Sequence, residues 1–240
     1  MEVFWQTIAA YNSATWIWQA VIAAAGVAAT AALILRPVPV TKMVMKFYMV
    51  FLYLWIAIVY YGIWCAPRNY SNIMVIMWCV MAFAWVWDAA KGETPFDRDR
   101  RYTLPALVMM MMPFVYPLLS VLRGKAFPEM TSPVMPCSVV TFTIGVLLMH
   151  SCKANLFILL LLCHWAFIGL SKTYMYEIPE DFLMAALSIP AAYMFLRDRF
   201  VPAAEEPSKP SVAVLKGLLV AVFICMGAIL IYTVLKIRGI

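Results

Sequence analysis

Residues 15–35 read TWIWQAVIAAAGVAATAALIL and contain no Asp, Glu, Lys or Arg. A helix needs roughly 20 apolar residues to cross the hydrocarbon core of a bilayer, and this stretch has that length. Because a backbone inside lipid has no water to bond with, it satisfies its own hydrogen bonds by forming a helix. The stretch therefore predicts a membrane-spanning α-helix near the start of the chain.

The composition of the whole chain extends this prediction. Of its 240 residues, 65% are hydrophobic and only 12% are charged, and the mean hydropathy is +0.88. A soluble domain carries about a quarter charged residues, and a chain of this length could not bury so much apolar surface in water. Uninterrupted apolar runs such as LFILLLL at 156–162 lack the alternation of barrel strands. We predict an all-α fold, a polytopic transmembrane helix bundle.

Apolar runs between charged or Pro- and Gly-containing breaks predict about eight membrane spans. They cover residues 15–35, 47–65, 71–90, 102–122, 137–152, 154–170, 180–196 and 212–235. Residues 2–13 are expected to form a short interfacial helix before the first span. The prolines within the fourth span are expected to kink or break it.

The polar, Pro-rich stretch RDRFVPAAEEPSKPS at 197–211 predicts a linker. The expected organisation is a seven-helix transmembrane core at 1–196, this linker, and an appended C-terminal transmembrane helix within 212–240. With the N-terminus outside, the inner loops hold twice as many Lys and Arg residues as the outer ones, which favours that orientation. The net charge of +6 is spread over the ends of apolar runs, so no nucleic-acid partner is expected.

Small residues at helical spacing predict contact faces on the first and last spans, because small side chains let membrane helices approach closely. These faces comprise Gln19, Ala23, Gly26 and Thr30, and Gly217, Ala221, Cys225 and Ala228. The last face is expected to dock within the bundle or on a partner. The expected partners are membrane lipids, together with other membrane subunits or a second copy of the chain. No cofactor is predicted.

The long loop 123–137, RGKAFPEMTSPVMPC, leads directly into the fifth span. Past it, Cys137, Thr141, Gly145 and Cys152 share one helical face, while Thr143 and His150 share another. One interpretation is a lid or re-entrant segment that delivers a thiol and hydroxyls to a cavity on the outer side. The other is a Pro-capped helix start whose small face packs against its neighbours.

Four further polar residues are candidates for a substrate or ion pathway. His164 lies deep in the sixth span, where an ionisable side chain usually faces the bundle interior. Its alternative is a neutral imidazole bonded to a neighbouring carbonyl, to Ser171 or to Thr173. His150 falls at a span end. Asp88 is expected to form an ion pair with Lys91, three positions further on, whose side chain reaches the membrane surface. A proton or cation site at Asp88 is the less favoured hypothesis. Asn155 is expected at the cavity.

The cysteines show no CxxC pair and mostly fall inside apolar runs, so they are expected to pack as small hydrophobic side chains. A thiol- or copper-handling site would use Cys137, Cys152 and Met135. The run Met109–Met112 points to four sides of a helix and cannot form one ligand set. No metal site is therefore firmly assigned.

Several short motifs carry a resemblance to a known family. They are Tyr11-Asn12 followed by Trp16 and Gln19, Trp55 with Val59-Tyr60, Tyr116-Pro117-Leu118, Pro136-Cys137 with Phe142-Thr143 and Gly145, and Ile178-Pro179-Glu180-Asp181. In these the chain resembles a bacterial family of multi-spanning membrane proteins catalogued only as a domain of unknown function. Ser138 stands where that family usually has a second Pro. The resemblance covers about residues 4–196 and implies a seven-helix core, but no activity.

These features leave three functional hypotheses for a bundle in a bacterial cytoplasmic membrane. The first is a small-solute or ion permease, or a solute-binding membrane protein, with a cavity lined by 123–145, Asn155 and His164. The second is an accessory or structural subunit of a larger membrane complex. The third is thiol or copper handling. No Walker loop, GxSxG, HExxH or dinucleotide motif is present, so no catalytic residue is assigned and an enzyme is not the favoured class.

Overall fold

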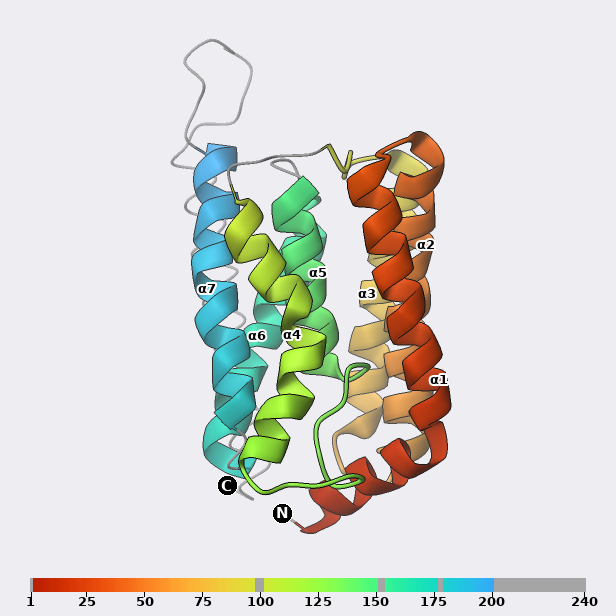
Figure 1. The fold of residues 1–240 in the computed structure, drawn as a ribbon, viewed down its shortest axis with the longest axis vertical. Helices are drawn as coiled ribbons and strands as arrows, with labels where there is room; N and C mark the ends of the chain where they lie inside the picture. Colours follow the sequence, from red (N-terminus) through yellow and green to blue (C-terminus); the bar gives the residue numbers. More distant parts are fainter. Residues whose placement is uncertain (1, 98–101, 151–153, 177–178, 201–240) are drawn as a thin grey trace. The chain divides into compact units, whose positions relative to one another are not determined.

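The computed structural model describes residues 2–97, 102–150, 154–176 and 179–200, and these form helices without any strand. The elements are α1 (Glu2–Leu35), α2 (Pro39–Trp55), the π-helix η1 (Ile56–Trp64), α3 (Ser71–Lys91), α4 (Thr103–Leu122), α5 (Pro136–His150), α6 (Leu156–Tyr176) and α7 (Pro179–Phe200). Figure 1 shows their order along the chain. The predicted all-α fold is confirmed.

Four of the described helices are long and apolar enough to cross a membrane: Val3–Leu35, Pro39–Trp64, Ser71–Lys91 and Thr103–Leu122. Shorter apolar helices cover Pro136–His150, Leu156–Gly169 and Asp181–Leu196. Each of the first seven predicted spans thus coincides with an apolar helix. The eighth prediction, 212–235, lies outside the described residues.

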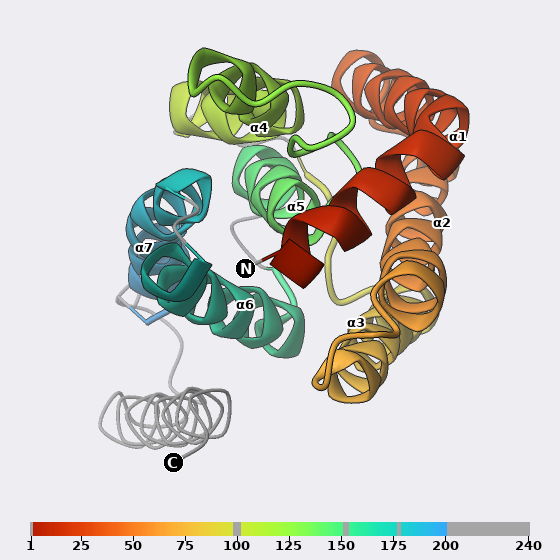
Figure 2. The same ribbon diagram turned by 90° about the horizontal axis from the view of Figure 1, so that it is seen from below.

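The chain divides into two compact units, Met1–Leu162 and Cys163–Ile240, and the boundary falls inside α6. In the first unit, α1, α2 and α3 lie side by side, and α5 packs against α4 (Figure 2). In the second, α6 and α7 are antiparallel neighbours, and a Cβ atom on Gly169 would overlap the side chain of Met184.

The N-terminal turns of α1 run across the end of the first unit at an angle to the rest of the helix (Figures 1 and 2). They are continuous with the first span, so residues 2–13 are not the separate helix that we expected. Arg68, between η1 and α3, stabilises this bend. Its Nε donates to Thr7 Oγ1 at 2.9 Å, its Nη2 donates to the Phe4 carbonyl at 3.0 Å, and the guanidinium lies 4.4 Å from the Phe4 ring centre.

The prolines of α4 do not break it. Pro105 lies in the first turn, where a missing N–H costs nothing, whereas Pro113 and Pro117 lie inside a helix that remains continuous to Leu122. Neighbouring helices can compensate the freed backbone groups in a membrane bundle. Close packing of α5 on α4 depends on Gly145, because a Cβ atom there would lie 2.8 Å from the Ala106 carbonyl oxygen.

Candidate functional site

The segment 123–135 between α4 and α5 takes a re-entrant course. Figure 1 shows it leaving the end of α4, turning back along the bundle between α4 and α1, and only then joining α5. With 15 residues, α5 spans about 22 Å, which is less than the roughly 30 Å of a bilayer core. The re-entrant segment therefore supplies part of the path that a longer helix would take.

Neutral hydrogen bonds from α1 fix this segment. Tyr11 Oη donates to the carbonyl oxygen of Val134 at 2.7 Å. The Asn12 amide donates to the carbonyls of Pro128 and Met130, both at 2.8 Å. The carbonyls of non-helical backbone lack the partners that a helix would provide, so side-chain donors replace them.

A second layer of side chains orients these donors. Trp55 Nε1 donates to Tyr11 Oη at 3.0 Å, and Gln19 Nε2 donates to Thr15 Oγ1 at 2.9 Å and to Asn12 Oδ1 at 3.3 Å. Tyr11, Asn12, Gln19 and Trp55 belong to the motifs that carried the family resemblance. Their common role was not apparent from the sequence, because the carbonyls that Tyr11 and Asn12 bind lie 116 to 123 residues further along the chain.

Beside the segment, an open groove of about 230 Å³ lies between α1 and α4, and α2 and α5 form its floor. Its walls include Val27, Ala31, Ile34, Leu107, Met111 and Phe114. Pro133 and Val134 of the re-entrant segment line it as well. Two polar side chains reach it: Tyr48, whose hydroxyl donates to the Ile22 carbonyl at 3.0 Å, and Thr30. The groove is thus suited to an apolar group.

The small-residue face predicted on the first span borders this groove. Ala23, Gly26 and Thr30 line it, and a Cβ atom on Gly26 would overlap the Tyr48 hydroxyl. Gly26 therefore lets α1 and α2 approach closely, as the pattern predicted. Gln19 is buried and belongs to the hydrogen-bonded layer behind the segment.

The hydroxyls predicted on α5 bond to protein groups. Thr141 donates to the Cys137 carbonyl at 2.8 Å, and Thr143 donates to the Val139 carbonyl at 2.7 Å, one helical turn back in each case. Thr143 Oγ1 also accepts a hydrogen bond from Tyr53 Oη at 3.0 Å. Both threonines are fully buried, and neither lines the groove.

The sulfur ligands proposed for copper are only partly described. Met135 Sδ accepts a hydrogen bond from the Ser132 backbone N–H at 3.3 Å, and Cys137 is half-buried. Cys152 lies outside the described residues. Within the described part of the chain, no group of three or more His, Cys, Asp or Glu side chains is arranged to hold a metal ion.

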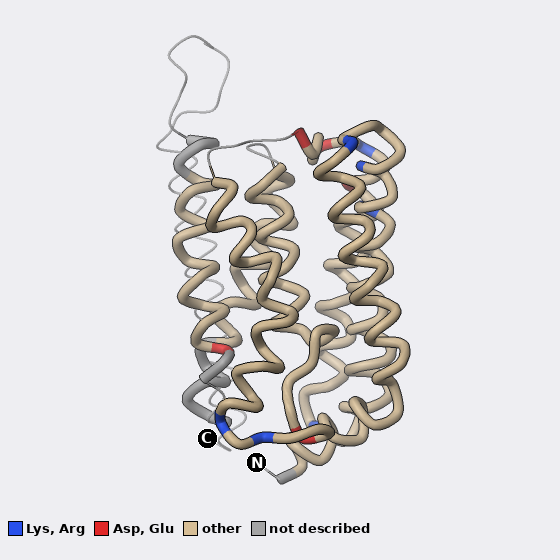
Figure 3. Tube along the Cα trace, in the orientation of Figure 1, with Lys and Arg blue, Asp and Glu red and all other residues tan. Residues whose placement is uncertain are grey.

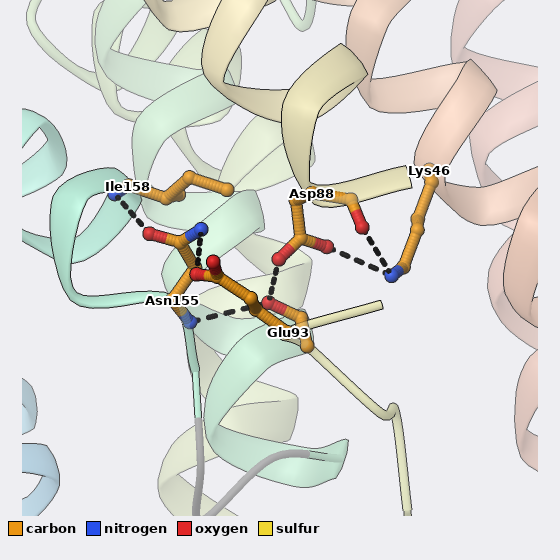
Figure 4. Close-up of polar contacts among 6 residues, drawn as sticks. Lys46, Asp88, Glu93, Asn155 and Ile158 are labelled. Atoms are coloured by element: carbon orange, nitrogen blue, oxygen red, sulfur yellow. Dashed lines mark hydrogen bonds and ion pairs between the residues drawn. The ribbon is translucent and has the colours of Figure 1, made fainter. Parts of the chain in front are cut away.

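A charged cluster, comprising Lys46, Asp88, Glu93, Thr94 and Asn155, lies in the first unit near the end of α3 (Figure 4). Lys46 Nζ is 2.8 Å from Asp88 Oδ2, and Thr94 Oγ1 donates to Asp88 Oδ1 at 2.8 Å. The side chain of Asp88 is fully buried and that of Lys46 is 6% exposed. Each charge is therefore neutralised by the other, as buried ions require.

The predicted partner of Asp88 was Lys91, and the structure corrects this. Lys91 Nζ lies 5.2 Å from the centre of the Trp87 ring instead, and Lys46 reaches Asp88 from the neighbouring helix. The sequence had placed Lys46 in a loop before the 47–65 span, but α2 begins at Pro39 and contains it. Spacing along one helix shows only which residues share a face, not which neighbouring helix covers that face.

Backbone geometry brings the rest of the charged cluster together. Gly92 has a φ of 72° and ends α3, which turns Glu93 and Thr94 back towards Asp88. The Asn155 backbone N–H donates to Thr94 Oγ1 at 3.2 Å, and its amide donates to Glu93 Oε2 at 2.7 Å.

Asn155 also caps α6, because its Oδ1 accepts from the backbone N–H groups of Phe157 and Ile158. It belongs to the charged cluster and does not line the groove. Figure 3 shows the charged residues of the described first unit gathered near the two ends of its helices.

The two histidines have different environments. His150, at the end of α5, is fully buried, with Nδ1 3.1 Å from the Val146 carbonyl oxygen and its ring edge against Phe96. His164 lies on α6 in the second unit and is half-buried. Its Nδ1 is buried without a hydrogen-bond partner among the described residues. The side chains of Ser171 and Thr173, its suggested partners, lie outside the described part.

These features define an all-helical protein with four described helices long and apolar enough to cross a membrane, a segment that folds back between α4 and α5, and an apolar groove. The chain belongs to the family of unknown function DUF6064, whose sequence profile matches residues 1–206. The match confirms the resemblance drawn from the short motifs. No curated protein and no solved structure matches the chain.

Proposed function

We propose that this protein binds a small apolar or amphipathic solute in the groove between α1 and α4. The observation that carries this proposal is an apolar groove beside a re-entrant segment. The proposed setting is a bacterial cytoplasmic membrane, crossed about eight times with the N-terminus outside. A ligand would then enter sideways from the lipid, since the groove is open on one side.

The lining supports an apolar ligand over an ion. A hydrated ion that entered the groove would lose its water and find only the hydroxyls of Thr30 and Tyr48 in exchange. Removing a charge from water without compensating partners costs many kcal/mol, whereas apolar surface gains free energy on burial. Among the permease and binding hypotheses, the geometry therefore favours binding of an apolar molecule. Transport of that molecule would require the re-entrant segment to move.

The test uses a photoreactive fatty acid with purified full-length protein in nanodiscs. Ala31 lines the groove and is exposed, so Ala31→Trp should fill it. Ala28→Trp is the matched control, because Ala28 is an equally exposed alanine of α1 that does not line the groove. We expect labelling of groove residues on α1 and α4 that falls about tenfold in Ala31→Trp and persists in Ala28→Trp, as expected for loss of over 1 kcal/mol.

Equal labelling of the two variants would contradict the proposal. The alternative is an accessory subunit of a membrane complex. It is supported by the outward side of α1, where Trp16, Ile17 and Trp18 are 56%, 57% and 61% exposed. Equal labelling, together with stoichiometric co-purification of another membrane polypeptide, would support the accessory-subunit function and exclude solute binding in this groove.

A further inference from the structure

We infer that a second groove, between α6 and α7, is the docking site of the chain's own C-terminal apolar segment, residues 212–235. This inference is independent of the proposed solute binding, since it concerns only the second compact unit. The groove has a volume of about 330 Å³ and is half open. The helices meet closely where a Cβ on Gly169 would overlap Met184, and the groove lies beyond this contact, towards the end of α7.

The floor of the groove presents small side chains at helical spacing. Ala185, Ser188 and Ala192 of α7 line it, together with Cys163 and Ala166 of α6. Small residues allow another helix backbone to approach closely, which is the main source of helix association in a membrane. Phe167, Ile189, Tyr193 and Leu196 complete the lining, and an acyl chain could contact these larger side chains without using the close approach that the small residues allow.

The buried hydroxyl of Ser188 indicates that the groove binds a protein segment. Ser188 lines the groove and is only 2% exposed, yet its Oγ has no hydrogen-bond partner among the described residues. An unsatisfied buried hydroxyl costs roughly 1–3 kcal/mol. A thiol or backbone carbonyl on an incoming helix can accept a hydrogen bond from this hydroxyl, whereas an acyl chain cannot.

The C-terminal segment carries the complementary pattern. Six residues of α7 line the groove, and four of them, at 185, 188, 192 and 196, are spaced by three, four and four residues; the small face of 212–235 is spaced by four, four and three. In two antiparallel helices the residue numbers rise in opposite directions, so the spacing of one helix matches the reversed spacing of the other position by position. The resulting pairs are Leu196–Gly217, Ala192–Ala221, Ser188–Cys225 and Ala185–Ala228.

The connection allows this arrangement. The chain leaves α7 at Phe200, and residues 201–211 follow before the apolar segment begins. Eleven extended residues reach roughly 35–40 Å, whereas adjacent packed helices are about 8–10 Å apart. A helix that starts beside the end of α7 and runs antiparallel to it places Ala221 and Cys225 at the depth of Ala192 and Ser188.

Disulfide trapping tests the pairing in the full-length chain in native membranes. The variant Ser188→Cys is made in a chain that keeps Cys225 as its only other cysteine. A protease site is inserted within 201–211. The control is Ala186→Cys, because Ala186 is exposed on another face of α7, two residues away. After oxidation and cleavage, a disulfide keeps the two fragments joined. We expect this disulfide to form at least about tenfold faster in Ser188→Cys than in the control, because contact raises the effective concentration of the two thiols.

Two results would overturn the inference. Equal joining of Ser188→Cys and Ala186→Cys would mean that 212–235 has no fixed place on α7. Joining only between two copies of the chain would mean that a second copy occupies the groove. Should Ser188→Cys not accumulate, the pair Ala192→Cys with Ala221→Cys, on a chain with Cys225→Ala, makes the same test and is read in the same way.

Discussion

The re-entrant segment and the charged cluster both satisfy polar groups within an apolar helical unit, but by different chemistry. At the segment, the neutral side chains of Tyr11 and Asn12 donate to backbone carbonyls. In the cluster, Lys46 and Asp88 neutralise each other. A neutral hydrogen bond contributes about 1 kcal/mol, whereas removing one member of a buried ion pair costs about 3–5 kcal/mol.

The contrast suggests that the two regions have different tasks. The cluster connects α2, the end of α3 and the start of α6; its two buried charges, Lys46 and Asp88, are paired, and the exposed Glu93 accepts a hydrogen bond from the Asn155 amide. It therefore behaves as a fixed structural connection. The segment borders the groove and is attached by bonds that are each weak enough to break reversibly. Under the proposed solute binding, it is the part of the first unit best suited to move.

The largest effect is expected when the ion pair is broken. Lys46→Met leaves the carboxylate of Asp88 buried without a counter-charge, so the free energy of unfolding should fall by about 3–5 kcal/mol. The measurement is chemical or thermal denaturation in detergent. The control, Lys42→Met, removes a pair with Asp97, whose side chain is 73% exposed, and should change stability little. Equal losses in both variants would remove the distinction between the two regions.

An intermediate effect is expected at the segment. Asn12→Ala removes the donors for the Pro128 and Met130 carbonyls, so the segment should loosen at a cost of about 2 kcal/mol. Faster tryptic cleavage at Lys125 would report this, with global unfolding much less affected than in Lys46→Met. Asn69→Ala is the control, because Asn69 is an exposed asparagine in the loop before α3. If cleavage stays at the wild-type rate, the segment is fixed by its other contacts.

The smallest effect is expected between the two regions, at the contact of α2 with α5. Thr143→Val preserves the shape of a buried side chain but removes the acceptor of the Tyr53 hydroxyl. Hydrogen bonds between membrane helices average about 0.6 kcal/mol, so stability should fall by about that amount. A loss as large as that of Lys46→Met would show that this hydroxyl pair is part of a larger polar network.

Several features of the molecule could be read from the sequence because they depend on neighbours along the chain. Continuous apolar runs define membrane helices, and all seven predicted spans that fall in the described residues coincide with apolar helices. Spacing on one helix also identified the close-contact face around Gly26, because residues three and four apart share a face. The unusual loop 123–137 could be singled out from its length and its prolines.

The contacts between helices could not be obtained in this way. Nothing near Asp88 in the sequence indicates Lys46, and Lys91 at the correct spacing was the wrong partner. Likewise, Asn155 looked like a cavity residue, but it caps α6 and binds Glu93. Which side chain covers a given face depends on helix packing, and packing brings together residues far apart in the chain.

The sequence by itself determined that this protein is a bundle of apolar helices, because hydropathy and length are local properties that lipid selects directly. Only the tertiary structure decided that α1 binds the re-entrant segment through Tyr11 and Asn12, that a groove opens beside it, and that Lys46 neutralises Asp88. These features depend on shape and on the pairing of polar groups across helices. Both are set by how the helices pack together.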